Sequence, residues 1–128
     1  MKKLLFITIL ALLMLSGCVK TVTLVVYNNS GKDVCITALG RKHDLKRQTA
    51  IRILAAAKSK HSLQVTDSVG NSYTASFTTP LHWNFHHYIY LQLEKDMKIY
   101  RVDNDKFPQL SLPPQSEGFP VVLSGGKK

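Results

Sequence analysis

Alternation of apolar and polar residues dominates this chain and predicts β-strands. In the run over residues 21–27, Val22, Leu24 and Val26 fall on one face. A dense turn signal, Asn-Asn-Ser-Gly at 28–31, follows this run and leads into a second predicted strand over residues 33–39. Two strands joined by a short turn form a hairpin in most β proteins, so we expect these two to pair.

A second hairpin is predicted over residues 62–78. Its strands, 62–66 and 72–78, flank a turn at 67–71 that is rich in Asp, Ser, Gly and Asn. The second strand alternates, and its predicted core face holds Tyr73, Ala75 and Phe77.

The clearest alternation covers residues 87–93, where three apolar side chains share a face: Ile89, Leu91 and Leu93. A tight turn at Lys95-Asp96 separates this strand from a returning one over residues 97–102. We expect a third hairpin here, with Ile99 facing the core.

Residues 40–61 fit two patterns. Leu45, Ile51, Leu54 and Ala55 allow a short amphipathic helix, whereas residues 49–54 also alternate as a strand with Ile51 and Ile53 on one face. The neighbouring segments are strands, and this context favours the strand.

Strands and turns at this spacing predict an all-β protein with a single antiparallel β-sandwich, immunoglobulin-like or transthyretin-like in general architecture, over residues 21–105. Residues 106–128 form a Pro/Gly-rich C-terminal segment. Within it, residues 121–123 are able to add one edge strand, and residues 124–128 are expected to be mobile.

The N-terminus has the composition of an export signal. Two lysines, Lys2 and Lys3, precede an apolar run over residues 4–15, and small residues follow. As a helix this run would be about 18 Å long, against about 30 Å for the hydrocarbon core of a bilayer. The run is therefore too short to span a membrane.

The sequence Leu15-Ser16-Gly17-Cys18 resembles the lipobox of bacterial lipoprotein precursors. The resemblance implies that residues 1–17 are a cleaved signal peptide and that Cys18 becomes the lipidated first residue. Residues 18–20 would then be the anchor and a short tether to the membrane. Val19, where aspartate would favour the inner membrane, points to the outer membrane facing the periplasm, if the organism has two membranes.

The chain is basic, with 17 Lys and Arg residues against 8 Asp and Glu residues. Loss of Lys2 and Lys3 with the signal leaves a net charge near +7, which attracts anionic neighbours. A basic stretch over residues 41–60 contains the candidate anion-binding residues Arg41, Lys42, Lys46, Arg47 and Arg52. The alternative is an ordinary solvated surface. An envelope location argues against nucleic acid as a partner.

A tryptophan and a group of histidines are further candidates for binding roles. Trp83 lies in a connection between predicted strands, so it is a candidate ligand contact, although aromatic residues in small β domains more often pack internally. His82, His86 and His87 invite a metal hypothesis, but His43 or His61 could supply a further ligand only if the fold brought it close, and we expect no metal site.

With Cys18 lipidated, Cys35 has no partner for a disulfide within the mature domain, and its apolar surroundings predict a buried thiol. No nucleophile elbow, zinc-protease helix or phosphate-binding loop is present in the sequence. We therefore expect no enzyme and no cofactor.

The expected function is that of a lipid-anchored cell-envelope lipoprotein acting as a non-catalytic protein-interaction or scaffolding module with an envelope protein partner. The alternative is binding of an anionic envelope polymer or lipid through the basic surface.

Overall fold

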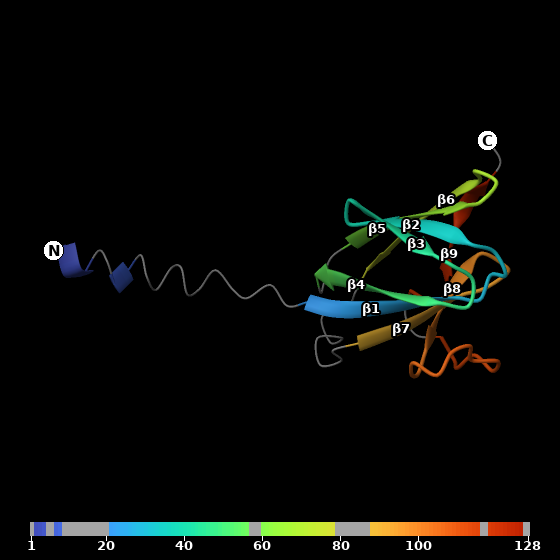
Figure 1. The fold of residues 1–128 in the computed structure, drawn as a ribbon. Helices are drawn as coiled ribbons and strands as arrows, with labels where there is room; N and C mark the ends of the chain where they lie inside the picture. The colour runs from blue at the N-terminus through green and yellow to red at the C-terminus, as the bar shows by residue number, and fades with distance from the viewer. Residues whose placement is uncertain are drawn as a thin grey trace.

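The computed structural model describes residues 2–4, 7–8, 21–56, 60–78, 88–115 and 118–126, and its strands form two sheets packed face to face (Figure 1). The first sheet has the order β4 (Ala50–Ala56), β1 (Thr21–Asn28), β7 (Tyr88–Leu93), β8 (Lys98–Val102) and β9 (Val121–Val122). The second sheet has the order β10 (Ser124–Gly126), β6 (Ser72–Thr78), β5 (Lys60–Asp67), β2 (Val34–Ala38) and β3 (Arg41–Leu45). The prediction of an all-β sandwich is confirmed.

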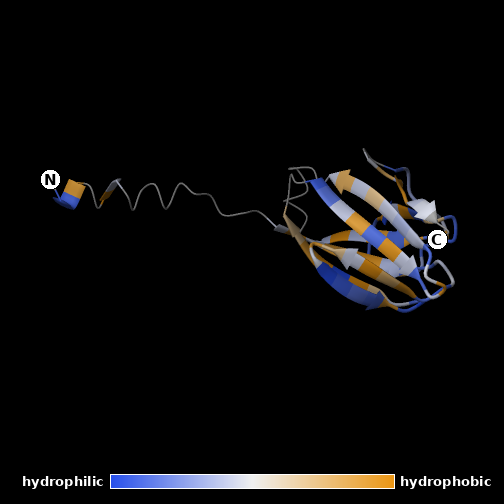
Figure 2. Cartoon of the chain, turned by 90° about the horizontal axis from the view of Figure 1, so that it is seen from above, coloured by the Kyte–Doolittle hydropathy of each residue, from blue (hydrophilic) through white to orange (hydrophobic). Residues whose placement is uncertain are grey.

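The core lies between the sheets and follows from the alternation in each strand. Hydrophobic and hydrophilic residues alternate along the strands in Figure 2, so each sheet has one apolar face. The side chains with the least exposure come from β1, β2, β3, β5 and β7: Val22, Val26, Ile36, Leu45, Val65, Ile89 and Leu93. Those of the predicted face of β6, namely Tyr73, Ala75 and Phe77, pack against this core.

The predicted hairpin between the first two strands is wrong. β1 pairs with β4 and β7 in the first sheet, whereas β2 pairs with β3 and β5 in the second. The turn residues at 28–31 therefore carry the chain from one sheet to the other. A turn signal marks a change of direction, but it does not specify which strand the chain joins afterwards.

The buried side chain of Asn28 holds this crossover together. Its Nδ2 donates to the carbonyl oxygens of Lys32 at 2.7 Å and Leu45 at 3.0 Å. Its Oδ1 accepts from the backbone N–H of Ser30 at 3.0 Å and from the Ser30 hydroxyl at 2.6 Å. One amide thus links the end of β1, the crossover and the end of β3, with its polar atoms paired inside the protein.

The expectation that all strand pairings are antiparallel also needs correction, because β1 and β7 are parallel. Strands in parallel pairs are commonly buried on both faces. β1 meets this condition in its second half, where Val25 and Tyr27 on the outer face are almost as buried as Val26 on the inner face.

The described residues of 40–61 form β3, β4 and the start of β5 and contain no helix, as the neighbouring pattern indicated. β4 pairs along its whole length with β1 and turns Ile53 and Ala55 into the core. β3 pairs with β2 through a two-residue turn in which Leu39 and Gly40 have φ of 52° and 74°. Positive φ at both positions is typical of the tight turn that matches the twist of a hairpin.

The other two predicted hairpins are confirmed. β5 pairs with β6 around the turn at 68–71, and β7 pairs with β8 around residues 94–97. In the second hairpin Ile99 is buried opposite Leu93, as its place in the alternation indicated.

The segment after β8 belongs to the sandwich and does not form a separate C-terminal unit. Phe107 stacks on Tyr27 with ring centroids 4.8 Å apart. The side chain of Gln92 accepts from the N–H of Gln109 at 2.8 Å and donates to its carbonyl at 3.0 Å. These contacts hold residues of 103–115 against the outer face of the first sheet, where the segment lies below β7 in Figure 1.

The end of this segment then contributes to both sheets. Phe119, Val121 and Leu123 are buried in the core. β9 extends the first sheet beside β8, and β10 extends the second beside β6, so the expected mobility of residues 124–126 is wrong. The apolar residues on either side of Pro120 anchor the tail, and this burial outweighs the low strand propensity of its Gly and Pro residues.

We predict that Asn28→Ala lowers the free energy of unfolding by about 2–3 kcal/mol, because it removes the donor to two carbonyl groups at a buried crossover. Denaturant unfolding of both proteins measures this difference. The control is Asn104→Ala, at an asparagine whose Oδ1 also accepts two hydrogen bonds, from the Lys106 N–H and from Gln109 Nε2, but in an exposed turn. Because water can replace these bonds, the expected change is below about 1 kcal/mol. An Asn28→Ala protein as stable as the parent would contradict the role of this amide.

We also predict an acid-sensitive turn between β5 and β6. Asp67 accepts from Asn71 Nδ2 at 3.0 Å, and from the N–H groups of Asn71 at 2.9 Å and Val69 at 3.0 Å. The Asn71 side chain is the largest cause that lowers the pKa of Asp67, and the two N–H groups and Lys32 add to it against the opposing effect of burial. A lowered pKa in the folded state stabilises the protein above the unfolded-state value of about 3.9, and this stabilisation is lost as the pH falls through the folded-state value.

The melting temperature measured from pH 6 to pH 2 tests this. Below about pH 4 it should fall more steeply for the parent than for Asp67→Asn, which has no carboxylate to protonate at this site. The exposed Asp105, changed to Asn, is the control and should leave the slope of the parent unchanged. Equal slopes for the parent and Asp67→Asn would refute the assignment.

Candidate functional site

A groove lies where the edge strands of the two sheets meet. β3 ends the second sheet and β4 ends the first, and the chain connects them directly through residues 46–49. The groove has a volume of about 380 Å³ and is lined by Ala38, Leu39, Arg41, His43, Arg52, Ile53 and Leu54. We call it the β3–β4 groove.

Two of the five candidate anion-binding residues meet in the β3–β4 groove. Arg41 starts β3 in the second sheet, and Arg52 lies in the middle of β4 in the first sheet. The Arg52 guanidinium carbon also lies 5.6 Å from the centre of the Tyr88 ring, a cation–π distance that orients the charge. Within the part of the chain that the structure describes, neither arginine is paired with a carboxylate.

The other three candidates do not join this pair. Lys42 is exposed and alternates with Arg41 along β3, so it belongs to the opposite face of the strand. Lys46 and Arg47 follow the other end of β3, about 15–20 Å along the strand from Arg41. The N–H of Arg47 donates to Asp33 there at 2.9 Å. The basic residues of the stretch therefore lie at both ends of β3 and on both of its faces, and do not form one surface.

The apolar part of the β3–β4 groove was missed by sequence reasoning. Leu39 is 51% exposed and Leu54 is 62% exposed, and the two are notable because they line the same groove and so form an apolar patch. Two signals could have revealed them. Leu39 occupies a hairpin turn where a polar residue is usual, and Leu54 alternates with the core residue Ile53.

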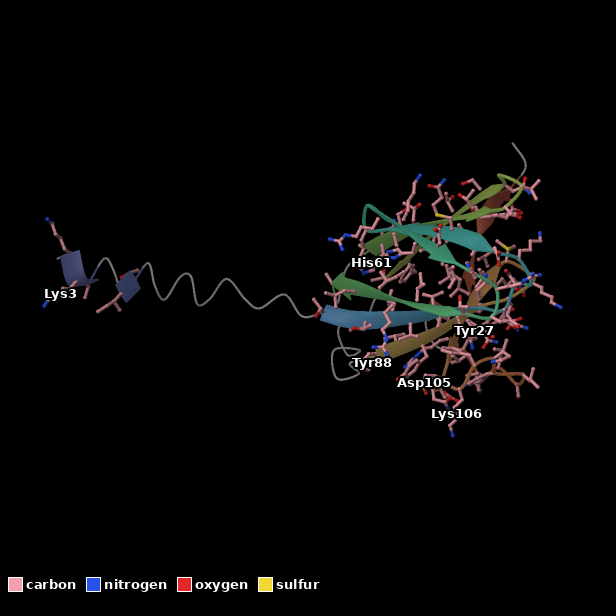
Figure 3. All side chains as sticks on the ribbon, viewed as in Figure 1. Lys3, Tyr27, His61, Tyr88, Asp105 and Lys106 are labelled. Carbon is pink, nitrogen blue, oxygen red and sulfur yellow. The ribbon has the colours of Figure 1, made fainter. Side chains whose placement is uncertain are left out.

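His61 lies behind the groove and connects the two sheets. Its Nε2 is hydrogen-bonded to the carbonyl oxygen of Ala56 at 3.0 Å, and its ring lies 5.4 Å from that of Phe77. Figure 3 shows it near the end of the sandwich where β1 begins, as it does Tyr88. His61 is buried, and its contacts with Ala56 and Phe77 give it a structural role.

The remaining sequence candidates have different outcomes. Cys35 is half-buried on β2, not buried as expected, because it alternates with the core residues Val34 and Ile36 and so faces outward. Trp83, His82, His86, His87 and Cys18 lie outside the described residues. Across residues 21–56, 60–78, 88–115 and 118–126, no three His, Cys, Asp or Glu side chains are grouped in a way that could hold a metal ion.

A second depression, of about 410 Å³, lies at the opposite end of the sandwich. It is lined by Asn29, Glu94, Lys95, Asp96, Tyr100, Gln109, Leu110 and Leu112. Leu110 is 93% exposed, more than any other large hydrophobic residue in the described part of the chain. We call this region the Leu110 surface.

The carboxylates of the Leu110 surface are held in place by hydrogen bonds. Asn29 Nδ2 donates to both oxygens of Glu94, at 2.9 and 3.1 Å. The Tyr100 hydroxyl donates to Asp96 at 2.6 Å, and this bond is the main cause that raises the pKa of Tyr100. The surface therefore combines an exposed apolar side chain with oriented negative charge.

Among the described residues, no helix is long and apolar enough to cross a membrane; residues 2–4 and 7–8 are helical. No family model, curated protein or solved structure matches this chain.

The two surfaces suit different ligands. The β3–β4 groove offers guanidinium groups beside exposed leucines, an arrangement that suits an anion attached to hydrocarbon or to an apolar side chain. The Leu110 surface offers an apolar anchor beside carboxylates, which suits a partner with an apolar side chain and a basic group.

Proposed function

We propose that this protein is a lipid-anchored lipoprotein of the bacterial cell envelope, acylated at Cys18 after removal of residues 1–17. The lipobox-like Leu15-Ser16-Gly17-Cys18 supports this. The position of the sandwich also supports it, because β1 begins at Thr21, three residues after Cys18, so the folded domain would follow the anchor directly. With Val19 next to the anchor, the expected site is the outer membrane, facing the periplasm, in a two-membraned organism.

In this location the protein acts as a non-catalytic interaction or scaffolding module that holds a partner protein at its Leu110 surface. The observation that carries the proposal is the grouping of Leu110, Leu112 and the Tyr100 ring in one depression beside fixed carboxylates. Apolar side chains that are grouped at the surface with a polar rim are typical of contact sites for other proteins, and side chains on a held segment lose less conformational freedom on binding.

The segment that carries Leu110 is held in place by contacts with the outer face of the first sheet. Gln92, fully buried, pairs with both backbone groups of Gln109, the residue before Leu110. Phe107 lies flat on Tyr27, with an angle of 4° between the rings. Two anchors within three residues of Leu110 hold it at the end of the sandwich opposite the start of β1.

A second candidate function is the binding of an anionic envelope polymer or lipid in the β3–β4 groove. It is favoured by Arg41 and Arg52, which come from different sheets and meet beside Leu39 and Leu54. Ionic contacts to a polyanion weaken steeply as salt is added, whereas an apolar protein interface is much less sensitive.

We predict that Cys18→Ser abolishes lipidation. Mass spectrometry of the protein purified from the membranes of a bacterial host should show a parent chain that begins at Cys18 and carries acyl groups. The variant should lack both the acyl mass and the cleavage before residue 18. A Cys35→Ser variant is the control and should be acylated normally, and an unmodified parent thiol at Cys18 would refute the anchor.

We predict that Leu110→Ser weakens the capture of the partner protein from the native envelope by about tenfold, because it removes an apolar anchor from the centre of the contact. Val69→Ser, at an exposed apolar residue outside both proposed binding surfaces, is the control and should capture as much as the parent.

The double variant Arg41→Gln/Arg52→Gln separates the two candidate functions in the same experiment. If this variant and added salt abolish capture while Leu110→Ser does not, the groove and not the Leu110 surface is the binding site.

A further inference from the structure

We infer that the end of the sandwich where β1 begins rests on the anionic lipid headgroups of the membrane that holds the anchor. Leu39, Leu54 and Tyr88 would enter the interface, and Arg41, Arg52 and Lys60 would contact the phosphates. The inference rests on the proposed acylation of Cys18, and it names the ligand of the β3–β4 groove as the bilayer itself.

The strand register of the first sheet places Leu54 and Tyr88 at the same distance along their strands, close to the start of β1. Thr21 pairs with Ala56, so β4 ends where β1 begins. Two residues further, Thr23 lies between Leu54 on β4 and Tyr88 on β7. Leu54 and Tyr88, 62% and 45% exposed, thus flank the strand that enters from the anchor.

The second sheet brings Leu39 and Lys60 to the same end. Lys60 begins β5, only four positions after the end of β4 at Ala56. The turn at Leu39 and Gly40 follows Ala38, which pairs with Leu63 near the start of β5. In Figure 1 this turn projects from the same end of the sandwich from which β1 starts.

The length of the tether keeps this end near the bilayer. Thr21 follows Cys18 by three residues, and three residues fully extended span at most about 11 Å. The headgroup layer on each side of a bilayer is about 5–7 Å thick. With the acyl chains inserted, the start of β1 therefore remains within reach of the headgroups in every orientation.

The charge distribution determines which side of the domain faces the lipid. Arg41, Arg52 and Lys60 are exposed at this end, where Asp103 lines a depression beside Tyr88. At the other end the acidic residues are accompanied by nearby basic ones, so that Asp33, Asp67, Glu94 and Asp96 lie among Lys32, Lys46, Arg47 and Lys95. The end with an excess of positive charge is attracted to an anionic surface, whereas the end with balanced charge is not.

The apolar side chains favour a lipid interface over a soluble polyanion. Protein surfaces that lie at the level of the lipid headgroups are rich in leucine and tyrosine beside arginine and lysine. There the apolar atoms contact acyl chains and the cations contact phosphates. A water-soluble polymer would use the charges but would leave Leu39 and Leu54 exposed to water.

Two matched leucine positions test the orientation. In a Cys35→Ser background, Leu54→Cys and Leu110→Cys each supply one free thiol, because the thiol of Cys18 is blocked by the lipid. The full acylated protein, labelled with a fluorophore, is placed in vesicles that contain a nitroxide lipid, with either phosphatidylglycerol or phosphatidylcholine as the main lipid. In phosphatidylglycerol the label at position 54 should be quenched at least about threefold more than the label at position 110.

The quenching at position 54 should decrease in Arg41→Gln/Arg52→Gln, in high salt and in phosphatidylcholine. Circular dichroism of each variant confirms that the sandwich is retained. Equal quenching at the two positions, or quenching at position 54 that depends on neither lipid charge nor salt, would overturn the inference.

Mass spectrometry of the protein used in the quenching experiment shows whether Cys18 is acylated. It therefore distinguishes a failure of the proposed anchor from a failure of the proposed lipid contact. If Cys18 carries no lipid, the proposed anchor is wrong, and the full unacylated chain is sedimented with phosphatidylglycerol vesicles instead. If the unacylated chain binds these vesicles and Arg41→Gln/Arg52→Gln reduces the binding at least about fivefold, the proposed lipid-contacting surface is supported. If the unacylated chain does not bind, this surface is refuted.

Discussion

The fold depends on a satisfied amide at the point where the chain first changes sheets. Asn28 ends β1 in the first sheet, and its side chain contacts the backbone of the crossover and of the last residue of β3 in the second. An unpaired amide would be costly at a site with no exposure to water, so the crossover is held in one geometry. β2 is thereby directed to the second sheet, and β3 and β4 become the edges that frame the β3–β4 groove.

A second constraint is the covering of the outer face of the first sheet. β1 has apolar or aromatic side chains on both faces in its second half, and the segment after β8 covers the outer ones through Phe107 and Gln109. The same contacts that shield Tyr27 from water hold Leu110 in position. Stability of β1 and presentation of the Leu110 surface therefore have one physical origin, and the two proposed binding surfaces lie at opposite ends of the sandwich.

The strands could be predicted from the sequence, and several of their partners could not. The inward faces of β1, β6, β7 and β8 follow from alternation alone, since side chains of a strand point to opposite sides at a period of two. Alternation carries no information on which strand lies alongside, so the hairpin expected after residue 28 was wrong. The tail at 124–126 was assigned mobility from its composition, whereas the burial of Phe119 and Leu123 upstream places it beside β6.

The candidate site shows the same division. Three properties could be predicted from the sequence: the concentration of basic residues in 41–60, the construction of the domain from strands, and the apolar face of most of those strands. They belong to single residues or to their nearest neighbours in the chain. Two other outcomes could be seen only in the folded protein: Arg41 and Arg52 meet while Lys42, Lys46 and Arg47 do not, and Leu39, Leu54 and Leu110 remain exposed at the surface of the domain. Those outcomes depend on the sheet to which each strand belongs, and sheet membership follows from contacts between residues far apart in the chain, among them the buried amide of Asn28.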